Sequence, residues 1–89
     1  MNISEIEALI RENKTGEALE ALNRSLSEEP RDARALFLRG KIWWRQGLRS
    51  AAMNDYAASA EIEPDGPAAR ALEQARDIEA FFNPDLLNP

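Results

Sequence analysis

Closely spaced acidic side chains are the residues of this chain that come nearest to a catalytic pattern. The pairs are Glu5 with Glu7, Glu28 with Glu29, and Glu61 with Glu63. Side chains one or two positions apart on a helix point in different directions, so these carboxylates do not converge on a substrate. The chain also has no histidine, no cysteine and no glycine-rich phosphate loop. Because the usual general base and thiol nucleophile are absent, the sequence predicts a protein that is not an enzyme.

The acidic residues around Pro64 suggest a second kind of chemistry, the binding of a hard cation. Glu61, Glu63 and Asp65 supply the carboxylates that such ions prefer. Their spacing lacks the central glycine and the final glutamate of a calcium loop. Solvated charge at a helix end is therefore the better interpretation, and we expect neither a metal nor a cofactor.

Positive charge is concentrated in the middle of a chain whose net charge is −5. Residues 31–49 contain six basic side chains and one acidic side chain. Residues 1–30 contain three basic and seven acidic side chains, and residues 50–89 contain two and eight. Such a basic segment either makes surface ion pairs with its acidic neighbours or forms a basic binding surface.

Aromatic residues interleave with these cations at Phe37, Trp43 and Trp44. Cations and aromatic rings together are also typical of surfaces that bind single-stranded nucleic acid. The acidic flanks and an isoelectric point near 4.7 argue against that ligand, because nucleic-acid-binding domains are usually basic.

The elements that must position these residues are five helices, since apolar residues recur at helical spacing in five segments and no strand pattern appears. Ser4 and Glu7 have the spacing of a capping box for the first helix, with Asn2 as an alternative cap. That helix is expected to end near Asn13-Lys14. Thr15-Gly16 is the expected turn before the second helix.

Later helix boundaries follow from caps and prolines. Asp32 and Ser50 are the expected N-caps of the third and fourth helices, and Gly47 is the expected stop between them. Pro67 is expected at the first position of the fifth helix, which Asn83-Pro84 should end.

Part of the chain recurs at a constant interval of 34 residues. The matching residues are Ala18 with Ala52, Leu22 with Tyr56, Ser25 with Ser59, and Glu29-Pro30 with Glu63-Pro64. A repeat interval of this size indicates helix pairs that stack side by side. We therefore predict an all-α stack of antiparallel helix pairs. Residues 33–36 recur at 69–72, two positions later than this interval would place them, so the register of the last helix stays open.

Residues 33–66 resemble a tetratricopeptide repeat (TPR). The resemblance rests on Gly40, Trp43, Gly47, Ala52, Tyr56, Ser59 and Pro64, all in one register. Residues 1–32 resemble a degenerate copy, and residues 67–82 resemble the helix that caps such arrays. The resemblance implies one domain, 1–89, built as a right-handed stack of five helices, with residues 67–89 as capping helix and tail. It also implies a non-catalytic role in protein–protein interaction.

The same resemblance implies a concave groove lined by the first helix of each repeat. In the second repeat the groove positions are Arg34, Phe37, Lys41, Trp44 and Arg45. Three cations and two aromatic rings suit a peptide or partner protein that has carboxylates and an apolar anchor, although Glu7 of the first repeat opposes an acidic ligand. Trp43 is about 100° away on the helix and is expected in the core. Gly40 is expected where another helix approaches closely.

Self-association is the main alternative function. Two repeats are fewer than the roughly three that usually form a stable array, so a monomer and a weak homodimer both remain open. The tail, Asn83–Pro89, would pack on its own last helix or occupy a groove. Residues 1–10 lack the pattern of a secretory signal, and no run approaches the roughly 20 apolar residues of a membrane span. The expectation is a cytoplasmic protein without a membrane partner.

Overall fold

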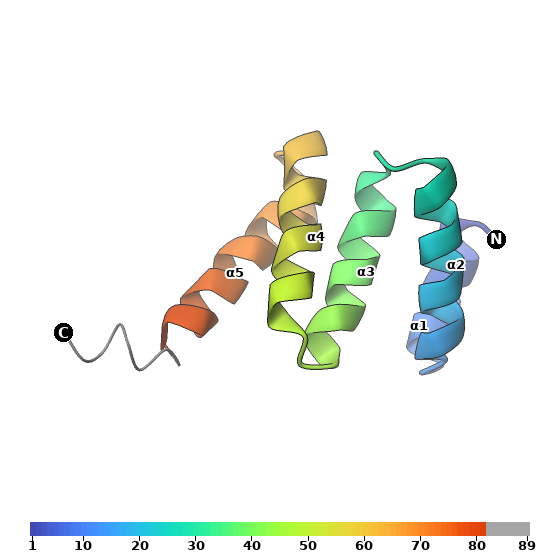
Figure 1. The fold of residues 1–89 in the computed structure, drawn as a ribbon, viewed down its shortest axis with the longest axis horizontal. Coiled ribbons are helices and arrows are strands. Elements are labelled where there is room, and N and C mark those ends of the chain that lie inside the picture. Colours follow the sequence, from blue (N-terminus) through green and yellow to red (C-terminus); the bar gives the residue numbers. More distant parts are fainter. Residues whose placement is uncertain (82–89) are drawn as a thin grey trace.

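Five helices and no strand make up residues 1–81, the part of the chain that the computed structural model describes (Figure 1). The helices are α1 (Ile3–Arg11), α2 (Thr15–Glu28), α3 (Ala33–Arg45), α4 (Arg49–Ile62) and α5 (Pro67–Phe81). The predicted all-α class with five helices is therefore confirmed. The expected break at Asn83-Pro84 and the tail lie outside the described residues.

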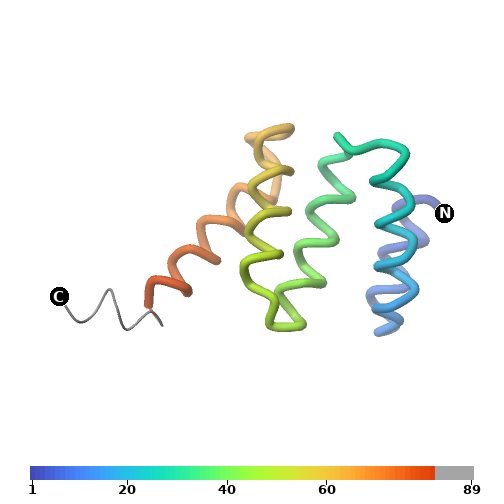
Figure 2. The backbone as a smooth tube through the Cα atoms, viewed as in Figure 1, coloured from blue at the N-terminus to red at the C-terminus, as the bar shows by residue number. Residues whose placement is uncertain are grey.

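Consecutive helices run in opposite directions, and short connections reverse the chain between them (Figure 2). In Figure 1, α2 and α4 lie nearest the viewer, whereas α1 and the start of α5 lie farther away. The starts of α2 and α4, at Thr15 and Arg49, are separated by the interval of the sequence repeat, and so are the starts of α3 and α5, at Ala33 and Pro67. The repeat interval therefore extends to the start of the last helix, although the recurrence of residues 33–36 at 69–72 is slightly longer.

The connection between α1 and α2 differs from its prediction. Asn2 caps α1, since its Oδ1 accepts a hydrogen bond from the Glu5 backbone N–H at 2.9 Å, so Ser4 is not the cap. α1 ends at Arg11, and Asn13 takes a left-handed φ of 64°. Asparagine tolerates that conformation better than most residues. The chain therefore turns at Asn13, and Thr15 already belongs to α2.

The start of α4 is the second difference. Gly47 follows α3 with a φ of 79°, as its predicted role as a stop requires, and this sharp turn leaves room for only a few residues between the helices. α4 consequently begins at Arg49, and Ser50 lies inside the helix instead of capping it. The predicted cap of α3 is confirmed, because Asp32 Oδ1 accepts from the Ala35 backbone N–H at 3.0 Å.

The core lies between the facing sides of the helices. Its largest fully buried side chains are Ile6, Leu22 and Ile42. Trp43, expected in the core, is only half-buried. Adjacent side chains on a helix point about 100° apart. Here Ile42, which is 1% exposed, points into the core, and the adjacent Trp43 points in a different direction.

Gly40 lies at a close approach of α4 to α3. A Cβ atom at this position would be 2.7 Å from two ring carbons of Tyr56 and 3.2 Å from the carbonyl oxygen of Ala52. The close approach predicted from this glycine is therefore confirmed, and the Tyr56 ring fills the place of the missing side chain.

Gly40→Ala should destabilise the protein. Alanine favours a helix by about 1 kcal/mol over glycine, but overpacking a tight contact typically costs about 1–3 kcal/mol. Gly16→Ala is the matched control, because Gly16 lies inside α2 and a Cβ there would meet nothing within 4 Å. Urea unfolding should show lower stability for the first variant and equal or higher stability for the second. Stabilisation by both would contradict the tight contact.

Candidate interaction surface

The five predicted groove residues lie on α3. They extend from a contact with α1 to a cavity shared with α5. At one end, Arg34 Nη2 pairs with Glu7 Oε2 of α1 at 3.0 Å. At the other end, Trp44 lines a small cavity together with residues of α5. The side of α3 that the sequence predicts as a binding face therefore meets α1 near its start and α5 near its end.

Phe37 forms the centre of this face. Its ring is half-buried, and two cations lie over it: Arg34 Cζ is 5.7 Å and Lys41 Nζ is 5.5 Å from the ring centroid. The ring of Tyr56 from α4 lies 5.9 Å away, tilted by 39°. These cation–π and aromatic contacts hold the two basic side chains against the helix surface.

Trp44 is also half-buried, and it belongs to a second cluster. The guanidinium of Arg49, the first residue of α4, lies 5.3 Å from the indole centroid. Arg49 also pairs with Glu79 of α5, Nη1 to Oε2, at 3.5 Å. This sequence of contacts joins α3, α4 and α5 around one aromatic side chain. Part of the Trp44 surface therefore packs against neighbouring helices.

The basic segment divides into paired and unpaired cations. Ion pairs engage Arg34 with Glu7, Arg39 with Asp55, and Arg49 with Glu79. Within residues 1–81, Lys41 and Arg45 form no ion pair, and both side chains are exposed. The expectation of surface ion pairs thus holds for part of the segment, and the unpaired cations of the groove set flank Trp44 in sequence.

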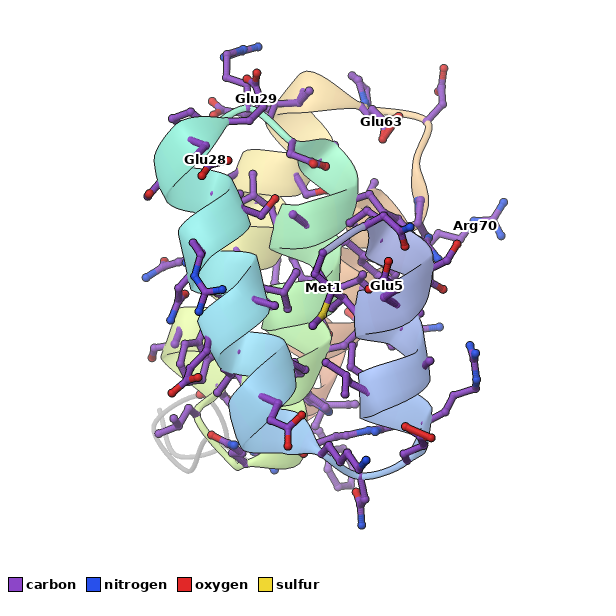
Figure 3. The ribbon with its side chains drawn as sticks, turned by 90° about the vertical axis from the view of Figure 1, so that its right-hand side faces the viewer. Met1, Glu5, Glu28, Glu29, Glu63 and Arg70 are labelled. Atoms are coloured by element: carbon purple, nitrogen blue, oxygen red, sulfur yellow. The ribbon has the colours of Figure 1, made fainter. Side chains whose placement is uncertain are left out.

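Acidic side chains gather at one end of the stack. Figure 3 shows Glu28 and Glu29, where α2 ends, and Glu63, just after α4, at the same end of the molecule. α3 begins at that end and runs away from it (Figure 1). Arg45 is the last residue of α3, so Lys41 and Arg45 lie toward the opposite end from the acidic cluster. Arg31, which also forms no ion pair within residues 1–81, precedes α3 at the acidic end.

A partly buried ion pair between α3 and α4 is the main feature that sequence reasoning missed. The pair joins Arg39 of α3 to Asp55 of α4. The Nε and Nη2 of Arg39 donate to Asp55 at 2.7 and 2.9 Å, and its Nη1 donates to Asn23 Oδ1 at 3.0 Å. Asp55 is only 7% exposed. The hydrogen bond to Asp55 raises the pKa of Arg39 above its usual value, so the guanidinium stays charged at any ordinary pH.

The spacing of residues on α4 contained a signal for this pair. Asp55 and Ser59 stand three and seven positions after Ala52, on the buried face of the helix. Polar side chains on a buried face need partners. Ser59 has one too, since its hydroxyl donates to the Ala33 carbonyl oxygen at 2.7 Å.

Other kinds of site find no support in residues 1–81. Within these residues, no group of three acidic side chains is arranged as metal ligands would be. Glu61, Glu63 and Asp65 therefore do not form such a group. Of the five helices, none has the length and apolar character needed to cross a membrane. Comparison of the chain with models of protein families, with curated proteins and with solved structures finds no match.

Asp55→Ala should destabilise the fold more than Glu7→Ala does. The first change leaves the partly buried Arg39 without its bidentate partner, at a cost of about 1–3 kcal/mol. The second removes an exposed ion pair worth less than about 1 kcal/mol. Adding Arg39→Leu to Asp55→Ala should recover part of the loss, because no charge is then left unpaired. Equal unfolding free energies for the two single variants would contradict this difference.

Tyr56 should make the fold sensitive to alkaline pH. Burial raises the pKa of its hydroxyl above the usual value of 10.0. The folded state therefore resists deprotonation, and this stability is complete below about pH 10 and is lost as pH rises through the raised folded pKa. Tyr56→Phe keeps the ring and removes the titration. Urea unfolding across this range should show a steeper loss for the native chain, and parallel curves would contradict the assignment.

Proposed function

We propose that this chain is a non-catalytic interaction module of the TPR type that binds an acidic peptide, or an acidic segment of a partner protein, on α3. Two features support the proposal. The chain carries the TPR-like pattern of residues 33–66, and its helices begin at the same interval as the sequence repeat. The function itself comes from that resemblance, because many unrelated activities share one fold.

The observation that carries the proposal is the pair of unpaired cations on α3. Lys41 and Arg45 are exposed, stand one helical turn apart, and flank Trp44. A guanidinium binds a carboxylate through two parallel hydrogen bonds, and an adjacent tryptophan supplies apolar contact area. Because α3 packs against α2 and α4, the backbone of this surface is already ordered before a ligand binds.

The ion pair between Arg34 and Glu7 limits where such a ligand sits. Each charge is neutralised by the other at 3.0 Å, so Arg34 is already engaged and Glu7 repels an acidic ligand less than an unpaired carboxylate would. The second half of α3, near Lys41, Trp44 and Arg45, is therefore the better place for carboxylates.

Lys41→Glu combined with Arg45→Glu should abolish binding of the partner. Arg24→Glu with Arg76→Glu is the matched control, since it changes the net charge equally at exposed positions on α2 and α5. Partners captured by cross-linking in the native host and identified by mass spectrometry should be lost with the first variant and kept with the second.

Arg45 also stands in the last turn of α3, where a cation favours the helix by roughly 0.3–1 kcal/mol. Circular dichroism of both charge variants must therefore show native helicity before capture is compared. Unchanged capture by a folded Lys41→Glu/Arg45→Glu protein would overturn the proposed site.

Single-stranded RNA is the test ligand for the rival function. The net charge of −5 should prevent binding even at low salt, where phosphate contacts are strongest. Fluorescence anisotropy with a labelled RNA across a salt series measures this directly. Binding at low salt that falls linearly with the logarithm of the salt concentration would favour nucleic acid instead.

A further inference from the structure

A cavity of about 120 Å³ lies beside Trp44, between α3, α4 and α5. Its walls are Trp44, Tyr56, Ala71, Gln74, Ala75 and Ile78. The four residues from α5 recur at steps of three and four, so they form one continuous face of that helix. On α3, Trp44 lies within one helical turn of Lys41 and Arg45, so the cavity adjoins the side of α3 that carries these two cations.

The walls of this cavity are mainly apolar. They consist of two aromatic rings, two alanine methyl groups and an isoleucine, with Gln74 as the one amide side chain. A closed apolar cavity of about 150 Å³ takes up benzene. A cavity of the present size therefore matches one aliphatic side chain, such as that of leucine or isoleucine.

The cavity is held in shape from two sides. Arg49 lies over the Trp44 ring and pairs with Glu79, which ties the indole to α4 and α5. Tyr56 is fixed by its contact with Gly40. At the rim, Ile78 is 38% exposed, so a side chain from another molecule reaches the cavity from solvent without displacing a helix.

Charge complementarity identifies the occupant. All four α5 residues of the wall are uncharged, whereas Lys41 and Arg45 stand three positions before and one position after Trp44. We infer that the cavity is an anchor pocket for one leucine-like side chain of an acidic peptide, whose neighbouring carboxylates bind Lys41 and Arg45. This inference rests on the proposed function and adds the specificity of the ligand to it.

Short capped peptides of aspartate and serine that differ at one central residue test the pocket. With leucine at the centre, binding should be about tenfold tighter than with alanine, equivalent to about 1.4 kcal/mol. Ala71→Leu fills the cavity and should bring both peptides to the affinity of the alanine peptide. Ala69→Leu is the matched control, since Ala69 is half-buried on the same helix but lines no part of the cavity, and it should keep the preference.

A spectroscopic readout locates the binding. The leucine peptide should shift the indole N–H signal of Trp44 more than that of Trp43, with Trp43→Phe used to assign the two signals. If Ala71→Leu loses helicity, Ile78→Ala decides, because it removes one wall at an exposed position and should reduce the leucine preference.

Several results would overturn the inference. Equal affinity of the two peptides would exclude the pocket, and the proposed function would still stand if Lys41→Glu/Arg45→Glu abolished binding. Self-association that Ala71→Leu removes would assign the cavity to a second copy of the chain. A Trp44 shift on Leu86→Ser/Leu87→Ser without peptide would assign it to the chain's own tail. Absence of any peptide binding would also overturn it, while partner capture judges the proposed function independently.

Discussion

The contact between Gly40 and Tyr56 is the constraint on which the rest of the structure depends. Only the absence of a side chain at Gly40 lets the tyrosine ring lie against the backbone of α3. From that position the same ring packs against Phe37 and forms one wall of the cavity beside Trp44. The close approach of α3 and α4 therefore determines where the Tyr56 ring meets Phe37 and where it lines the cavity. A looser contact would change both.

Charge performs two separate tasks in this molecule. Arg39 and Asp55 form a bidentate pair that is largely shielded from water, and such a pair specifies how α3 and α4 align, because a misaligned pair would leave a buried charge unmatched. Lys41 and Arg45 lie on exposed surface and form no ion pair within residues 1–81. A carboxylate from a ligand meets little competition there, so the basic segment is partly structural and partly open to a partner.

Periodicity predicted the helices well, since the apolar spacing depends on residues close in sequence and the recurrence of matched residues marks where each helix pair begins. The sequence also predicted that another helix approaches closely at Gly40, because glycine inside a helix is unfavourable. It failed where the outcome depended on a partner or on a single dihedral angle. Asp55 lies 16 residues from Arg39, so their pairing depends on how two helices align. The turn at Asn13 replaced the expected turn at Thr15-Gly16, because a left-handed residue reverses the chain earlier.

The two adjacent tryptophans show why the candidate site was only partly predictable. Helical rotation separates them by about 100°, but rotation alone does not say which direction the core occupies. Ile42 is buried in the core, and both tryptophans are half-buried. Trp44 gained its distinct surroundings from Arg49 and from α5, neither of which the groove pattern on α3 includes. α5 therefore has two roles: it covers α4 and also completes the apolar wall opposite Trp44.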